Sequence, residues 1–97
     1  RRILADEGVV SAIVCIDRAN KKIVAGPQIT TRGWVHEAES GDLLGDLAER
    51  VRNAVQSGLD EGAEQSRLEK LIRKSAGSFV SDRTRRRPMI VPVVLEA

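Results

Sequence analysis

The spacing of hydrophobic positions predicts two strands at the start of the chain. Residues 8–16 read GVVSAIVCI, a short run rich in β-branched side chains, which favours a buried strand. A second extended run covers residues 22–35, and the turn formers Asp17 and Asn20 lie between the two, so the pattern predicts a hairpin. Gly26-Pro27 interrupts the second run. Because proline donates no hydrogen bond to a ladder, the interruption indicates an edge strand or a bulge.

After the hairpin, the apolar residues recur at the three-and-four spacing of a helix. Ser40 is the expected N-cap, Asp42 and Asp46 follow near the positive end of the helix dipole, and Gly58 is the expected terminator. The apolar positions of this predicted helix are Leu43, Leu44, Leu47, Ala48, Val51, Ala54, Val55 and Leu59.

A second helix and a third strand complete the pattern. The segment SRLE at 66–69 matches a capping box, in which Ser66 caps and Glu69 reaches back. The helix must end before Pro88, since the residue preceding a proline is forced into extended geometry. The segment MIVPVVL at 89–95 then predicts a strand, and Pro92 marks it as an edge or an irregular one.

The predicted order is therefore strand, strand, helix, helix, strand. Two helices with one apolar face each cover one face of a three-stranded sheet, which gives an α+β fold of the two-layer sandwich type. A chain of 97 residues supports one core and no second one. The chain begins with RRILADEG and no methionine, which indicates a piece of a longer protein.

Composition excludes several classes of function. Aromatic residues make up 2% of the chain, so a platform for stacking nucleic-acid bases is almost absent. The single cysteine, Cys15, forms no disulfide within the chain, which fits a reducing compartment. The sequence has no apolar run long enough to span a membrane and no segment that resembles a signal peptide.

Catalytic chemistry finds little support in the residues. The only histidine, His36, stands 21 positions from Cys15, and no spacing resembles a zinc site. Asp42, Asp46 and Glu49 share one helix face, and a solvated face does not separate their pKa values for acid–base work. The serines lack a histidine partner. We therefore predict no catalytic, cofactor-binding or metal-binding residue in this chain.

The densest positive charge allows two interpretations. The segment RTRRRP at 83–88 lies at the predicted end of the second helix, where cations satisfy the last carbonyls and the helix dipole. Alternatively, these cations contact RNA phosphates or another subunit. The candidate contact residues are Arg83, Arg85, Arg86, Arg87, Arg73 and Lys74.

The third strand is the candidate subunit interface. The sheet has potential edges at the second and third strands, and MIVPVVL is apolar on both faces, which is more than a half-exposed edge needs. An exposed apolar edge or face of this kind is typical of a docking surface. The candidate interface residues are Met89, Ile90, Val91, Val93 and Val94.

The order of these segments resembles the C-terminal domain of the bacterial ribonuclease J family. The similarity spans nearly the whole chain, and its most specific parts are AGPQITTRGWV at 25–35 and RTRRRPMIVPVVLE at 83–96. The resemblance implies that residues 1–7 end a linker from a catalytic core absent here, and that residues 8–97 form a single C-terminal domain. It also implies association with oligomerisation, as a homo-oligomer (dimer or tetramer), rather than catalysis.

The resemblance further implies what the parent protein does. Ribonuclease J is a cytoplasmic, metal-dependent 5′–3′ exoribonuclease and endoribonuclease of mRNA decay and rRNA maturation. Its two zinc ions belong to the metallo-β-lactamase region, whose histidine- and aspartate-rich motif has no match in this sequence. The implied partners are thus the chain's own catalytic domains, further copies of itself and, through the parent enzyme, RNA, with no membrane.

Overall fold

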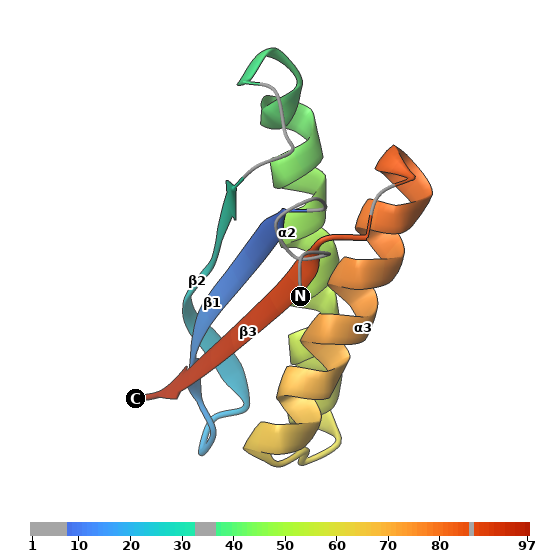
Figure 1. Ribbon diagram of the computed structural model, residues 1–97. Coiled ribbons are helices and arrows are strands. Elements are labelled where there is room, and N and C mark those ends of the chain that lie inside the picture. Colours follow the sequence, from blue (N-terminus) through green and yellow to red (C-terminus); the bar gives the residue numbers. More distant parts are fainter. Residues whose placement is uncertain (1–7, 33–36, 86) are drawn as a thin grey trace.

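The computed structural model describes residues 8–32, 37–85 and 87–97, and it confirms the predicted order of elements (Figure 1). The fold is α+β, with one three-stranded sheet and two helices. Strand and helix bounds are β1 Val9–Asp17, β2 Lys22–Arg32, α2 Glu37–Asp60, α3 Gln65–Thr84 and β3 Met89–Glu96. Gly33 to His36 lie outside the described residues, and so does the predicted continuation of the second strand to residue 35.

The first strand lies in the middle of the sheet, which has the order β2-β1-β3. β1 pairs antiparallel with β2 and parallel with β3. In the turn between β1 and β2, the Lys21 amide donates to the Arg18 carbonyl at 3.2 Å, as the predicted hairpin requires. The parallel partner β3 arrives only after both helices, because a parallel connection must cross back over the sheet.

Both predicted edge strands are edges in the structure. The register between β1 and β2 shifts on either side of Cys15, near the Gly26-Pro27 pair that indicated an edge or a bulge. Gly26 has a φ of +86°, and a Cβ atom there would lie 2.7 Å from the Ile13 carbonyl oxygen. This close approach of two backbones explains the glycine.

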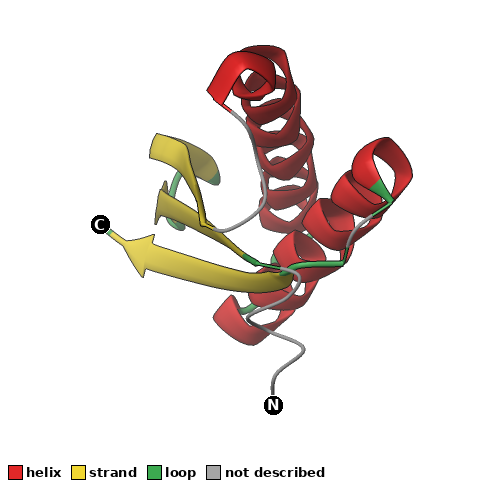
Figure 2. Cartoon of the chain, turned by 45° about the horizontal axis from the view of Figure 1, so that its top comes forward, coloured by secondary structure: helices red, strands yellow, loops and turns green. Residues whose placement is uncertain are grey.

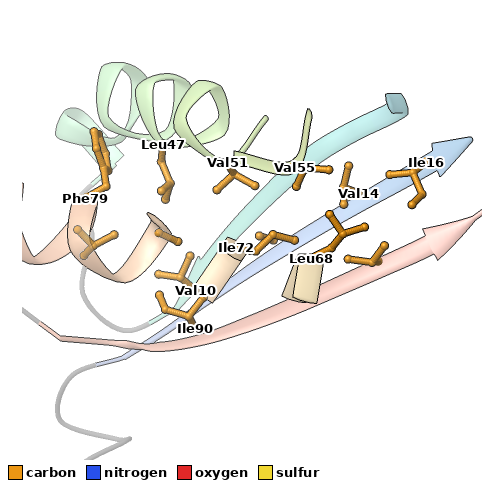
Figure 3. Close-up of a cluster of buried hydrophobic side chains, with 14 of the residues drawn as sticks. Val10, Val14, Ile16, Leu47, Val51, Val55, Leu68, Ile72, Phe79 and Ile90 are labelled. Atoms are coloured by element: carbon orange, nitrogen blue, oxygen red, sulfur yellow. The ribbon is translucent and has the colours of Figure 1, made fainter. Parts of the chain in front are cut away.

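The two helices lie side by side on one face of the sheet and enclose the core (Figure 2). Alternate residues of β1 point into this core, because successive side chains of a strand face opposite sides. Figure 3 shows these side chains meeting those of both helices in one layer of hydrocarbon. The fully buried, larger members are Ile16, Leu47, Leu59, Leu68, Ile72, Val10, Val14, Val51, Val55 and Val80.

The predicted ends of the first helix are wrong at both termini. α2 begins at Glu37, so Ser40 lies within the helix rather than at its N-cap. It continues through Gly58 to Asp60. The chain leaves the helix at Gly62, whose φ is +78°, and the Ala63 amide donates back to the Gly58 carbonyl at 2.9 Å. This is a Schellman ending, and a glycine is favoured at the residue with positive φ rather than four residues earlier.

Gly58 has a different role from the predicted one. It is buried inside α2, and a Cβ atom at this position would lie 2.7 Å from side-chain atoms of both Leu68 and Leu71. The missing side chain therefore lets α2 and α3 approach closely at this end of the helix layer.

The predicted capping box of the second helix is also wrong. α3 begins at Gln65, its N-cap is Glu64, and no side chain caps it. Ser66 consequently lies inside the first turn, and Glu69 accepts a hydrogen bond from Gln65 at 3.4 Å instead of reaching back to Ser66. The Leu68 amide already donates to the Glu64 carbonyl at 3.0 Å, which places the first helical bond earlier than the motif predicts. The predicted end before Pro88 is confirmed.

Candidate interaction site on the open sheet face

The sheet face opposite the helices is uncovered by any described element (Figure 2). Side chains of cross-strand partners share a face, so the register identifies its members. Apolar residues of β1 and β3 make up its apolar half, and polar residues of β2 make up most of the remainder. We call this surface the open sheet face; its apolar half comprises Val9, Ile13, Cys15, Met89, Val91, Val93 and Leu95, with Ser11 of β1 among them, and its polar half includes Gln28, Thr30 and Arg32.

The apolar half coincides with the parallel pair of strands. Parallel strands normally have both faces covered, whereas antiparallel strands commonly leave one face to water. The sequence of the β1–β3 pair is largely apolar on both faces, as in parallel strands that are covered on both sides. In the structure, however, only one face of this pair is covered. Met89 and Leu95 remain 44% and 52% exposed, and Val91 and Val93, which lie between them on the same face, are half-buried. This half of the sheet therefore has the composition of a surface that another layer covers.

The outer edge of β3 is much less suited to binding a partner, as an added strand, than the open sheet face is. The Met89 and Ala97 amides donate to β1, so the even-numbered residues of β3 direct their backbone groups to the free edge. Pro92 is one of these residues and has no amide to offer. At the next outward residue, Gln65 already donates to the Val94 carbonyl at 3.3 Å. Strand addition at this edge is thus obstructed.

The predicted interface residues divide between the two faces of β3. Met89, Val91 and Val93 belong to the open sheet face, whereas Ile90 and Val94 are buried beneath α3. The last two are core residues, and nothing outside the chain reaches them in the folded state. The sequence interpretation missed Leu95, and also Val9 and Ile13 of β1, because alternation along a wholly apolar strand does not reveal which face is covered.

The first arginine of the cluster is engaged within the chain. Arg83 donates to Asp46 of α2 at 3.3 Å, and its guanidinium lies 5.0 Å from the centre of the Phe79 ring. Arg50 of α2 lies over the same ring at 5.2 Å. Two cations on one aromatic ring and one carboxylate join the two helices by cation–π and ionic contacts.

The other predicted contact residues have different surroundings. Arg85 is the exposed C-cap of α3, with a φ of 63°, and its amide donates to the Ser81 carbonyl. Arg87 is exposed, and Arg86 lies outside the described residues. Arg73 and Lys74 lie on the exposed side of α3, between two and three turns before this cluster. Among the described predicted residues, Arg73 and Lys74 therefore lie apart from Arg83.

The described residues also bear on the excluded functions. Among them, no three histidine, cysteine, aspartate or glutamate side chains are grouped as a metal ion requires, while His36 lies outside the described part. Cys15 is half-buried on the open sheet face and is unpaired. In the described ranges, no helix is both long and apolar enough to cross a membrane.

An arginine in the hairpin turn joins three separate parts of the chain. Arg18 donates to both carboxylate oxygens of Glu96, at 3.3 and 2.9 Å, and to the Ala63 carbonyl at 2.6 Å. It therefore links the β1–β2 turn to the end of β3 and to the loop between the helices. The hydrogen bonds from Arg18 hold the pKa of Glu96 below its ordinary value of 4.5. In the same turn, the side chain and amide of Asn20 lower the pKa of Asp17.

The lowered pKa of Glu96 predicts a pH-dependent stability. A carboxyl group whose pKa is lower in the folded state contributes stability above its unfolded pKa, and loses it as the pH falls through the folded value. We expect Glu96→Gln to melt at a lower temperature than the wild type at neutral pH. The difference in melting temperature should shrink as the pH falls below 4.5, because Glu96 of the wild type then becomes protonated and neutral, as glutamine is at every pH. Thermal unfolding followed by circular dichroism at several pH values measures it.

Glu49→Gln, at an exposed position of α2, serves as the control for this experiment. It removes the same charge without touching the Arg18 contacts. A difference between wild type and Glu96→Gln that stays constant down to pH values well below 4.5 would contradict the assignment.

The fold and this surface define a small two-layer α+β domain whose sheet has one covered face and one apolar, uncovered face. Comparison with known proteins then identifies its family. The model of the ribonuclease J C-terminal domain matches residues 1–97, so the chain belongs to that family.

Relatives with assigned names agree with this membership. The chain is 41% identical over 97 residues to ribonuclease J 2 of Staphylococcus aureus (strain NCTC 8325 / PS 47). It is 40% identical over 97 residues to ribonuclease J 2 of Staphylococcus epidermidis. Each match covers 99% of this chain and 17% of the relative. The chain thus corresponds to a small part of a ribonuclease J, as the sequence resemblance predicted.

Proposed function

We propose that this chain is the oligomerisation and accessory domain of a ribonuclease J, and that it has no catalytic residue of its own. The observation that supports this proposal most directly is the open sheet face. Seven apolar or sulfur-containing side chains from two adjacent strands lie there together, on a domain whose helices already cover the other face. Apolar patches of this kind on small domains are typical of docking surfaces.

A second copy of the chain is the occupant that fits this face best. Two sheets pack face to face with their layers about 10 Å apart. A two-fold axis through the apolar half would stack the β1–β3 strips of the two copies on each other. Gln28, Thr30 and Arg32 of β2 would then lie toward the rim. An apolar centre with a polar rim is the usual composition of a protein interface.

The chemistry of the parent enzyme lies outside this chain in our proposal. The parent would be a cytoplasmic, metal-dependent 5′–3′ exoribonuclease and endoribonuclease of mRNA decay and rRNA maturation. Its two zinc ions would be held by its catalytic domains, which are the other expected partners of this chain. The described residues offer no cluster suited to a zinc ion, which is compatible with this division of roles.

Solution mass across a concentration series tests the proposal. We expect light scattering coupled to size exclusion to give a mass above 10.6 kDa that rises with concentration toward that of a dimer or tetramer. A mass that stays at the monomer value at the highest concentration would overturn self-association. The catalytic domains of the parent would then be the better candidate for covering the open sheet face.

The Arg83–Arg87 cluster was the sequence-based alternative, as an RNA-phosphate site, and it stays a prediction. Its first member is already engaged with Asp46 and Phe79. Arg73 and Lys74, the predicted contact residues earlier on α3, are exposed and lie apart from Arg83.

A further inference from the structure

The two helices have opposite charge. α2 contains six carboxylates and two arginines, whereas α3 contains five cations and two carboxylates. The net charge of +2 for the whole chain conceals this separation. Since the helices lie side by side, two elements of opposite net charge are neighbours in the helix layer (Figure 1).

Four cations of α3 form a continuous basic row. Arg67, Lys70, Arg73 and Lys74 are all exposed and occupy two turns of the helix. Among the residues that the structure describes, none of the four has a carboxylate within 4 Å or another recorded partner. Arg83, in contrast, is paired with Asp46. The uncompensated positive charge of α3 is therefore in this basic row and not at Arg83.

The helix geometry keeps acidic side chains out of the row. At 100° per residue, the four cations fall within a sector of about 120°, and all four are exposed. Glu69 and Asp82, the two carboxylates of α3, fall outside it. Ser78, which is exposed, follows Lys74 about one turn later.

This surface suits a phosphodiester backbone better than a protein surface. Lysine, which makes up half of the row, is depleted at protein interfaces, whereas aromatic side chains, methionine and arginine are enriched there. The exposed large apolar side chains of the described residues are Val24, Met89 and Leu95, and none of them is on α3. Cations with neighbouring hydroxyl groups are the side chains that contact phosphate oxygens. The scarcity of aromatic residues excludes base stacking as the source of affinity.

We propose that the basic row binds the phosphate backbone of single-stranded RNA without sequence preference. The unpaired cations follow one another along α3, so the RNA lies along this helix. The row is on the helix layer and the open sheet face is on the opposite side of the domain, so one chain can bind RNA and a second copy at once. The inference is independent of self-association.

The salt dependence of binding tests the inference. We would titrate a fluorescent single-stranded uridine oligomer with the 97-residue chain between 50 and 200 mM salt. Four phosphate contacts give a slope of log K against log salt of about −2.8, or a loss of roughly 50-fold across this range. Lys70→Gln/Lys74→Gln should reduce the slope to about −1.4, because it removes two of the contacts.

Lys21→Gln/Arg52→Gln is the matched control. It removes the same charge from exposed positions in the hairpin turn and on α2, and it should leave the slope unchanged. Melting temperatures of both variants near that of the wild type establish that each remains folded. Absence of measurable binding at 50 mM salt would overturn the inference. So would an equal reduction of slope in both variants, which would indicate attraction by net charge alone.

Discussion

Replacing Val91 by aspartate should abolish self-association while leaving the domain folded. Val91 lies at the middle of β3, pairs with Ser11 of β1, and belongs to the apolar half of the open sheet face. In a two-fold interface, the substitution would introduce two short carboxylates into a largely apolar layer, where the Ser11 hydroxyl is a neighbour but no cation pairs with position 91 within the sheet. Burying an unpaired charge is strongly unfavourable. We expect the association constant to fall by at least about 100-fold, which corresponds to roughly 2.7 kcal/mol.

The measurement is the same light-scattering series, joined by thermal unfolding at several concentrations. Association of folded copies raises the melting temperature with concentration, so the wild type should show this dependence and Val91→Asp should not. Asn53→Asp adds the same charge at an exposed position of α2, in the opposite layer, and should behave like the wild type.

Two results would oppose the interface assignment. One is an unchanged association constant for Val91→Asp, which would place the contact elsewhere on the domain. The other is an equal loss for Asn53→Asp, which would point to the helix layer or to net charge. Val91→Thr keeps the shape and the strand propensity of valine. It should therefore weaken association far less than the aspartate does.

Local sequence was sufficient for the order of elements and for the strand edges. The change of apolar spacing after the hairpin separated strands from helices, and Pro27 and Pro92 identified β2 and β3 as edges. Both inferences depend on physics that acts within a few residues, namely side-chain periodicity and the missing proline amide.

The predictions of the helix ends were wrong because short-range signals compete. SRLE satisfies the capping-box pattern, yet the backbone turns helical earlier, at Gln65. Gly58 looked like a terminator, but it lies where α2 meets Leu68 and Leu71. The sequence alone does not show whether a glycine is required by packing between helices or by a turn. Only the tertiary structure distinguishes the two.

The surfaces were harder still to predict, because they depend on contacts between distant residues. β3 is apolar at nearly every position, so its covered face became known only when its register against β1 was fixed. The Arg18–Glu96 bond joins residues 78 positions apart, and no local pattern indicates it. The basic row was divided in the sequence interpretation, where Arg73 and Lys74 were grouped with Arg83. The pairing of Arg83 with Asp46 shows that they belong to different surroundings.

Truncating Ile72 to alanine should cause a large loss of stability without acting on either proposed surface. Ile72 is 0% exposed and lies on α3 between α2 and the sheet (Figure 3). Removing a buried isoleucine to alanine typically costs 2–5 kcal/mol, because the transfer energy is lost and a cavity remains. A domain of this size has a total stability of about 5–15 kcal/mol. The variant should therefore lose a large part of its stability.

Urea unfolding and thermal melting measure this effect. A loss of about 3 kcal/mol corresponds to a melting temperature lower by roughly 12–24 °C for a domain of this length. Arg73→Ala, at the next position of α3 and exposed, is the control and should change stability little. A shift for Ile72→Ala no larger than that of Arg73→Ala would mean that the two layers do not pack as described. Since the open sheet face is the outer side of the same sheet, the argument for self-association would then fail as well.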